Sequence, residues 1–109
     1  MYSLKEIDAA TLNEWLTSGR KFRLVDVRSP AEFAQGMIPA GEPLPLHLLP
    51  LRANEFSPDT EIVFYCRSGA RSGQACMYLS QLGIENVYNL RGGIMDWARQ
   101  GFRLDDAAA

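Results

Sequence analysis

A run of four apolar residues, Ile62 to Tyr65, leads directly into a cysteine and a short polar loop. The run is unbroken and rich in β-forming side chains, so it predicts a strand at the centre of a sheet. Beyond the loop, apolar side chains recur at the spacing of one helix face: Ala75, Cys76, Leu79 and Leu82. The sequence therefore predicts a strand, a loop and a helix in succession, with Cys66 at the carboxyl end of the strand.

Strand and helix patterns alternate along the rest of the chain as well. Further strands are expected at 3–7, 22–27 and 86–90 and near 42–45, with helices at 8–17, after Ser29, within 46–54 and at 94–100. This order predicts a three-layer α/β domain with a mainly parallel central sheet and helices on both faces. Ligands of such sheets gather outside the carboxyl ends of the strands, which is where Cys66 is expected.

Two helix starts carry clear capping signals. Asp8 is suited to cap the first helix. Ser29, Pro30 and Glu32 together form a capping box with proline at the first helical position. Pro50 is expected to interrupt any helix in the proline-rich stretch 37–54.

Length and composition indicate one globular domain. The chain has 109 residues, 47% of them hydrophobic and 22% charged, with a formal net charge of -2 and a pI near 5.3. We expect a single domain over residues 1–109, with a core at about 3–104 and a frayed tail at 105–109. We expect no nucleic-acid or membrane partner and no secretory leader, and hence a cytoplasmic protein.

The loop after the central strand combines a thiol with groups that stabilise anions. Backbone amides of the loop and the N-terminus of the following helix favour the thiolate of Cys66 and would bind an oxyanion above it. We expect the substrate to be bound by the residues that follow the cysteine: Arg67, Ser68, Gly69, Ala70, Arg71 and Ser72. A thiolate in such a loop is suited to covalent catalysis on an anionic donor.

The spacing from Cys66 to Arg71 bears on the identity of that donor. Four residues separate the two, whereas protein tyrosine phosphatases place five residues between cysteine and arginine, and Ser72 stands where their arginine would be. A smaller loop favours a single sulfur atom over a phosphoryl group as the cargo. A phosphatase or arsenate reductase of related fold is the less favoured alternative.

Three motifs together resemble the single-domain rhodanese family. The first is the loop from Cys66 to Ser72, the second is Asp26 to Phe33 (DVRSPAEF), and the third is Val87 to Ile94 (VYNLRGGI) with Trp97. They occur in the order typical of the family and span most of the chain. One departure is Gly36 to Gly41, which reads GMIPAG where the family often has GHIPGA. The resemblance therefore does not predict the backbone path of this loop.

This resemblance implies a five-stranded parallel sheet and a thiosulfate sulfurtransferase without a metal or organic cofactor. Cys66 would be the catalytic nucleophile, taking sulfane sulfur as a persulfide and passing it to cyanide or a thiol. Thioredoxin or a sulfur-carrier protein are the partners that this implies, with the chain as a monomer or weak dimer. A relay module that accepts persulfide sulfur from a partner protein is the alternative.

Several other residues are interpreted as structural. Cys76 lies on the apolar helix face and is expected in the core. Arg28 is expected to pair with Glu32, and His47 to lie at the surface or the rim of the pocket. The pair Gly92-Gly93 is expected to form a tight turn between strand and helix.

Overall fold

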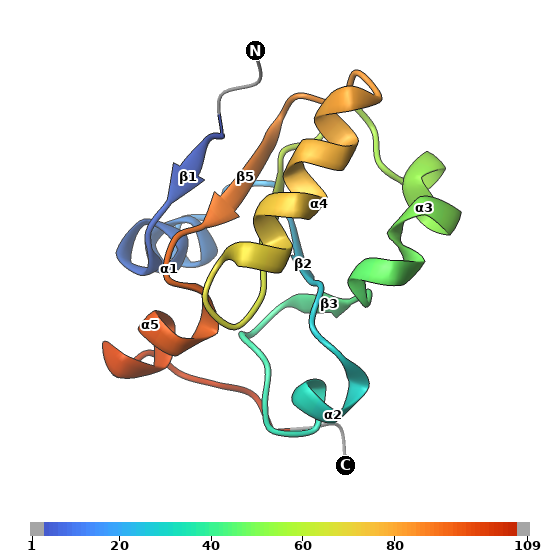
Figure 1. Ribbon diagram of the computed structural model, residues 1–109. Coiled ribbons are helices and arrows are strands. Elements are labelled where there is room, and N and C mark those ends of the chain that lie inside the picture. Colours follow the sequence, from blue (N-terminus) through green and yellow to red (C-terminus); the bar gives the residue numbers. More distant parts are fainter. Residues whose placement is uncertain (1–3, 107–109) are drawn as a thin grey trace.

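A computed structural model describes residues 4–106, and its centre is a five-stranded sheet, whose place between the helices is seen in Figure 1. The strands are β1 (Glu6–Ile7), β2 (Arg23–Asp26), β3 (Gly41–Pro43), β4 (Ile62–Tyr65) and β5 (Val87–Leu90). Their order in the sheet is β1-β5-β4-β2-β3, and every neighbouring pair is parallel. The predicted α/β class, the five-stranded parallel sheet and the central place of β4 are confirmed.

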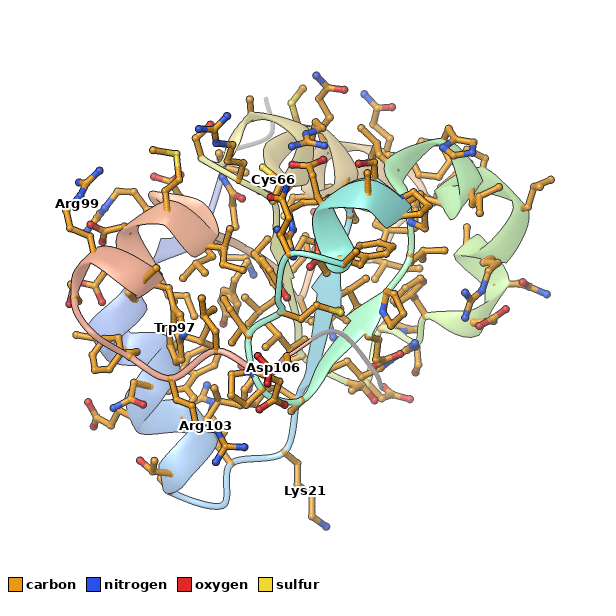
Figure 2. All side chains as sticks on the ribbon, turned by 90° about the horizontal axis from the view of Figure 1, so that it is seen from below. Lys21, Cys66, Trp97, Arg99, Arg103 and Asp106 are labelled. Carbon is orange, nitrogen blue, oxygen red and sulfur yellow. The ribbon has the colours of Figure 1, made fainter. Side chains whose placement is uncertain are left out.

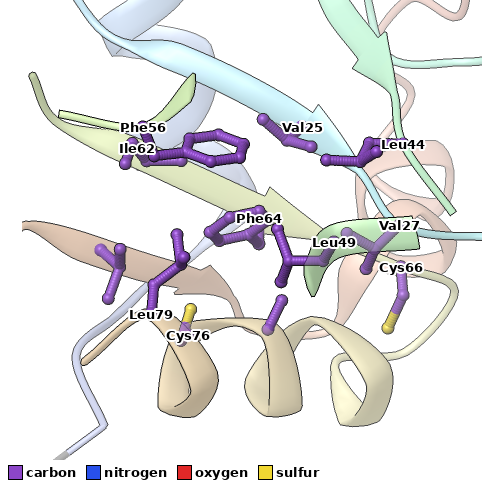
Figure 3. Packing of buried hydrophobic residues seen from close by; sticks show 12 residues of the cluster. Val25, Val27, Leu44, Leu49, Phe56, Ile62, Phe64, Cys66, Cys76 and Leu79 are labelled. Atoms are coloured by element: carbon purple, nitrogen blue, oxygen red, sulfur yellow. The ribbon is translucent and has the colours of Figure 1, made fainter. Parts of the chain in front are cut away.

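Helices cover both faces of the sheet. The longer helices are α1 (Ala9–Thr17), α4 (Ala70–Gln81) and α5 (Gly93–Arg99). Along β4, Ile62 and Phe64 point into one apolar cluster, together with residues of α4, and Val63 and Tyr65 point into the other, with residues of α1 and α5. Because successive strand residues face opposite sides, one buried strand supplies both cores. Figure 3 shows the first cluster, between the sheet and α4.

The two predicted helix starts are confirmed. The Asp8 carboxylate accepts a hydrogen bond from the Thr11 amide at 2.8 Å and caps α1. Ser29 and Glu32 form the reciprocal capping box of α2 (Pro30–Phe33), with Pro30 in its first turn. Capping of this kind explains how so short a helix keeps a fixed position beside the carboxyl end of β2.

The proline-rich connection folds into short helical turns after β3. These are η1 (Leu46–Leu48), α3 (Leu49–Arg52) and η2 (Ala53–Glu55). Pro50 lies in the first turn of α3 rather than breaking a helix, so the expected interruption is wrong there. The first turn of a helix tolerates proline because its amides have no partner within the helix.

The GMIPAG segment takes a conformation that explains its unusual residue order. Ala40 has a φ of +71°, which among the described residues is the sole positive φ outside glycine. A Cβ atom on Gly41 would lie 2.8 Å from the Tyr65 hydroxyl, which itself accepts a hydrogen bond from the Ile38 amide at 3.1 Å. The close approach requires glycine at position 41, and Ala40 is left in the left-handed region, which is strained for alanine.

The C-terminal segment packs back on the domain. Trp97 donates from Nε1 to the Arg103 carbonyl at 2.8 Å, and Figure 2 shows the two residues close together. Asp105 and Met37 exchange two backbone hydrogen bonds, of 2.8 and 3.0 Å, in an antiparallel bridge. The expected fraying is therefore wrong at Asp105. Residues 107–109, and Ser3 of the expected first strand, lie outside the described residues.

Within residues 4–106, none of the helices combines the length and the apolar character that a membrane crossing requires.

Candidate active site

Cys66 lies at the carboxyl end of the central strand, at the start of the loop that enters α4. Its side chain is 1% exposed, and Figure 3 shows its sulfur turned toward the first turn of the helix. Gly69 caps α4 with a φ of +117°, a conformation open to glycine and strained for other residues. This geometry folds the loop tightly enough to bring its amides back over the sulfur.

Two groups of the predicted loop contact the sulfur directly. The Gly69 amide donates a hydrogen bond to Sγ at 3.1 Å, and Ser72 Oγ lies 3.3 Å from Sγ. Burial by itself raises the pKa of the Cys66 thiol. Hydrogen bonds from the Ser72 hydroxyl and from the amides of Ser72, Gly69 and Ser68 outweigh that effect, so the pKa is lowered.

The two arginines of the loop do not contact the sulfur by hydrogen bonds. Arg71 forms a two-pronged ion pair with Glu32 on α2, with distances of 2.6 and 2.8 Å. Arg67 is exposed, as are Ser68 and Ala70. The groups placed to stabilise a Cys66 thiolate are thus amides and a hydroxyl. The pKa of Arg71 is raised mainly by its ion pair with Glu32, and to a smaller extent by Cys66.

The expected pairing of Arg28 with Glu32 is wrong. Arg28 instead binds Asp26, two residues earlier, in a buried ion pair with a shortest distance of 2.8 Å, and it also donates to the Gly36 carbonyl at 2.7 Å. Because α2 turns Glu32 toward α4, its carboxylate is available to Arg71. Arg71 and the capping box together hold the pKa of Glu32 at about 2.

Helix α5 supports the loop from the other side, a role that the sequence reading missed. The Ile94 amide donates to the Cys66 carbonyl at 3.0 Å, and the Met95 amide donates to the Arg67 carbonyl at 3.1 Å. A Cβ atom on Gly93 would lie 2.3 Å from the Arg67 carbonyl oxygen. The Gly-Gly pair was the available signal, because it permits a close approach of backbones as well as a turn.

Asn89 of β5 is the second contributor that the sequence reading missed. It is 2% exposed and lies 2.5 Å from Ser72 Oγ through its Oδ1 atom. Its Nδ2 atom donates to the Gly69 carbonyl at 3.1 Å and to Glu6 at 3.2 Å. The signal in the sequence was the polar Asn89 among apolar and aromatic residues of an expected strand, because a polar side chain that becomes buried needs hydrogen-bond partners.

Two cavities flank the loop. The first, of about 310 Å³, is lined by residues of the β2 and η1 region and by Arg71: Val27, Arg28, Ser29, Pro30, Pro45, Leu46, His47 and Arg71. The second, of about 210 Å³, lies beside Arg67 and the C-terminal segment, and Met95 and Leu104 are among its lining residues. His47 is exposed at the first cavity, as expected of a residue at the rim.

Cys76 takes no part in this arrangement. It is fully buried in the cluster between α4 and the sheet, as predicted, and burial raises the pKa of its thiol to about 12. Both cysteines are free thiols. Figure 3 shows the Cys76 sulfur directed into the core, away from the loop.

The chain is thus an α/β domain with a parallel sheet. Its candidate nucleophile, the buried Cys66 thiol, lies at the carboxyl end of β4, under the N-terminus of α4. A family model described as "Rhodanese-like domain" matches residues 8–100. The chain therefore belongs to the rhodanese-like domain family, as its three motifs predicted.

Individual relatives agree with this assignment. A protein of Allochromatium vinosum named "Sulfurtransferase" is 54% identical over 101 residues, which are 93% of this chain and 94% of that protein. The crystal structure of a rhodanese-like domain protein from Staphylococcus aureus is similar with a TM-score of 0.86 and 30% identity, covering 96% of this chain and 100% of that one. A thiosulfate sulfurtransferase from Pseudomonas aeruginosa is similar with a TM-score of 0.87 and 27% identity, covering 97% of this chain and 21% of that one.

Proposed function

We propose that this protein is a sulfurtransferase that carries a sulfane sulfur atom on Cys66 as a persulfide. One observation carries the proposal: the buried Cys66 sulfur accepts a hydrogen bond from the Gly69 amide and lies 3.3 Å from the Ser72 hydroxyl, at the start of α4. The family assignment and the relative named a sulfurtransferase support sulfur transfer as the class of reaction.

In the first step, the Cys66 thiolate attacks the outer sulfur of thiosulfate. A bond forms between Sγ and that sulfur, the sulfur–sulfur bond of thiosulfate breaks, and its electron pair leaves with sulfite. The negative charge then rests on the outer sulfur of the persulfide. The loop amides that hold the thiolate are the groups suited to hold this charge, since a nest of amides binds an anion of either kind.

In the second step, an acceptor nucleophile attacks the outer sulfur. Cyanide leaves as thiocyanate and a thiol leaves as a persulfide, and in each case the sulfur–sulfur bond breaks with its electron pair returning to Cys66. The thiolate is thereby restored. Arg67, Ser68, Ala70 and Arg71 remain proposed substrate-binding residues because they belong to the loop and the first turn of α4, next to the sulfur.

A relay that accepts sulfur from a partner protein is the second candidate. The exposed side chains of Arg67, Met95 and Leu104 favour it, because they line part of a cavity beside the loop and offer a partner a mixed charged and apolar surface. Thioredoxin or a sulfur-carrier protein would be partners of this kind. Comparison of turnover with thiosulfate against transfer from a persulfidated protein separates the two functions.

Phosphate chemistry is less favoured by the geometry. Phosphatases of related loop design need an arginine over the phosphoryl group, but Ser72 occupies that position and is fully buried. The nearest arginine along α4, Arg71, is paired with Glu32. An aryl phosphatase activity that disappears in Cys66→Ser would revive this alternative.

The proposed function is tested by thiocyanate formation from thiosulfate and cyanide. We expect turnover by the wild-type protein and by Cys76→Ser, and none by Cys66→Ser, with circular dichroism showing that all three are folded. Turnover that survives in Cys66→Ser would overturn the proposal. Slow turnover with thiosulfate but fast transfer from a protein persulfide would favour the relay.

A further inference from the structure

The Ser72 hydroxyl lies between two acceptors but has a single proton. Its oxygen is 2.5 Å from Asn89 Oδ1 and 3.3 Å from Cys66 Sγ. Ser72 and Cys66 are essentially buried, so bulk water does not supply a replacement partner. A hydroxyl donates one hydrogen bond, so it cannot fully serve the amide oxygen and the sulfur at the same time.

The orientation of the Asn89 amide is fixed by its other contacts. Nδ2 faces the Gly69 carbonyl at 3.1 Å and the Glu6 carboxylate at 3.2 Å, and both of these groups are acceptors. The reverse orientation would place an oxygen against two oxygens. Oδ1 must therefore face Ser72, where it accepts and cannot donate.

We propose that Asn89 is a positioning residue that competes with the Cys66 sulfur for the Ser72 proton and so favours the neutral thiol. This inference rests on the proposed function, because it assigns Asn89 to the control of the proposed nucleophile. In the thiol state, Ser72 donates to Asn89. When the thiolate forms, the hydroxyl turns to the sulfur and leaves Oδ1 without a partner, at a cost in free energy.

The same competition has a consequence after sulfur transfer. In the persulfide, the charge lies on the outer sulfur, and Sγ becomes a neutral, weak acceptor. The Ser72 hydroxyl then returns to Asn89, and the loop amides are left to hold the outer sulfur. Asn89 thus provides the alternative acceptor that lets the hydroxyl change direction with the charge of Cys66.

Other charged groups near Cys66 come from several elements and do not substitute for this contact. They are Glu6 on β1, Asp26 and Arg28 at the end of β2, Glu32 on α2, Arg67 in the loop and Arg71 on α4. Arg71 is paired with Glu32, and Arg28 with Asp26. The variants below keep all of these groups, so the charged background is the same in each comparison.

The test measures the pH at which the alkylation rate of Cys66 by iodoacetamide is half maximal, read on the Cys66 peptide by mass spectrometry. Asn89→Leu removes the competing acceptor with little change in size, and we expect the midpoint to fall by about one pH unit. The Gly69 carbonyl keeps the Gly73 amide as a donor, at 3.0 Å, so the loop retains a support. Asn89→Val is a second variant with the same expected direction.

A double-mutant comparison separates competition from a purely structural role. Ser72→Ala should raise the midpoint. Adding Asn89→Leu to Ser72→Ala should leave the midpoint unchanged, because the hydroxyl for which Asn89 and the sulfur compete is absent. Tyr88→Phe is the matched control on the same strand. Its hydroxyl bonds to Glu61, away from the loop, so the midpoint should not move. A fall that persists unchanged in Ser72→Ala, or a rise in Asn89→Leu, would overturn the proposal.

A measurement on the unsubstituted chain keeps the test independent of variant folding. The carbonyl ¹³C resonance of the Asn89 side chain should shift with the same midpoint as Cys66 alkylation. A resonance that stays constant across that midpoint would refute the competition. Neither readout uses a sulfur donor, so failure here leaves persulfide formation standing, and failure of persulfide formation leaves this result standing.

Discussion

Cys66 and Cys76 carry the same thiol group, but their surroundings change its pKa in opposite directions. Amides and the Ser72 hydroxyl outweigh burial at Cys66 and lower the pKa of its thiol. At Cys76 burial dominates and raises the pKa to about 12. The two thiols therefore differ in their hydrogen-bond donors and not in their exposure, because both side chains are almost completely buried.

Selective alkylation follows from this contrast. At neutral pH, iodoacetamide should modify Cys66 and leave Cys76 unmodified, with a midpoint for Cys66 below the ordinary value of about 8.5. The sign follows from the lowered pKa, since a larger thiolate fraction at a given pH means a faster reaction. Peptide mass spectrometry measures both sites in one sample. A Cys66 midpoint at or above 8.5 would show that the loop does not activate the thiol.

The ion pair between Glu32 and Arg71 is expected to affect both the stability of the fold and the binding of thiosulfate. Glu32→Gln keeps an oxygen for the capping box but removes the charge that neutralises Arg71. We expect a loss of unfolding free energy of about 0.5–1 kcal/mol, because both side chains are partly exposed. We also expect the KM for thiosulfate to fall about two- to fivefold, since the freed guanidinium attracts the anion.

Urea unfolding and steady-state kinetics check the two effects. Arg52 and Glu55 form an exposed ion pair on α3 and η2, and Glu55→Gln is the control for loss of a surface ion pair. It should leave the KM unchanged. A higher KM in Glu32→Gln would show that Glu32 orients Arg71 for binding instead of competing with the substrate.

At the scale of elements, the loop is held between the first turns of two helices. Helix α4 directs its amides at the sulfur, and α5 binds the Cys66 and Arg67 carbonyls through the amides of Ile94 and Met95. With their carbonyls directed toward α5, these peptide units leave the amides of the loop facing the sulfur. The close contact with α5 depends on the absence of a side chain at Gly93.

Gly93→Ala tests the support by α5. The new Cβ would meet the Arg67 carbonyl oxygen at 2.3 Å, and the residue has a φ of +58°. We expect a loss of stability of about 2–4 kcal/mol from strain and displacement of the loop, together with loss of activity. Urea unfolding measures the first and thiocyanate formation the second.

Gly83→Ala is the matched control for Gly93→Ala. It shares a positive φ, of +89°, but beyond its chain neighbours no heavy atom lies within 4 Å of the new Cβ. Its expected loss is about 1–2 kcal/mol from backbone strain, with activity retained. Equal losses in the two variants would contradict the role given to the contact between α5 and the loop.

The sequence predicted those features that depend on residues close together along the chain. The capping residues Asp8 and Ser29 and the strand before Cys66 are short-range patterns, and the structure agrees with them. The predicted partner of Arg28 was wrong, because the choice between Asp26 and Glu32 depends on the direction in which α2 presents Glu32. Asn89 and Gly93 reach the loop from about twenty residues away along the chain, so no local pattern could assign their contacts.

At the scale of the whole molecule, the all-parallel sheet explains why these distant residues meet. The carboxyl ends of β2, β4 and β5 lie at one edge, and the segments that follow them supply Glu32, Cys66 and Gly93. The same packing distributes ion pairs over the surface. Several carboxylates in these pairs and caps have lowered pKa values: Asp8, Glu32, Glu55 and Glu61.

Acid stability follows from these lowered pKa values. A carboxylate whose folded pKa lies below its unfolded value stabilises the fold above the unfolded pKa, and this stability is lost as pH falls through the folded one. The ordinary value for glutamate is 4.5, and that of Glu32 in the fold is about 2. The unfolding free energy should therefore fall between about pH 4.5 and pH 2, and less steeply in Glu32→Gln. Urea titrations from pH 7 to pH 2 measure it, and a flat profile would contradict the pairing.

Intact mass spectrometry detects persulfide formation on Cys66 without any acceptor reaction. After incubation with thiosulfate and removal of the excess, the protein should gain one sulfur, about 32 Da, and lose it on addition of cyanide. The gain should occur in the wild type and in Cys76→Ser and be absent in Cys66→Ser. An unchanged mass after incubation with thiosulfate and with a persulfidated donor protein, or a gain retained in Cys66→Ser, would show that Cys66 does not carry sulfur as a persulfide.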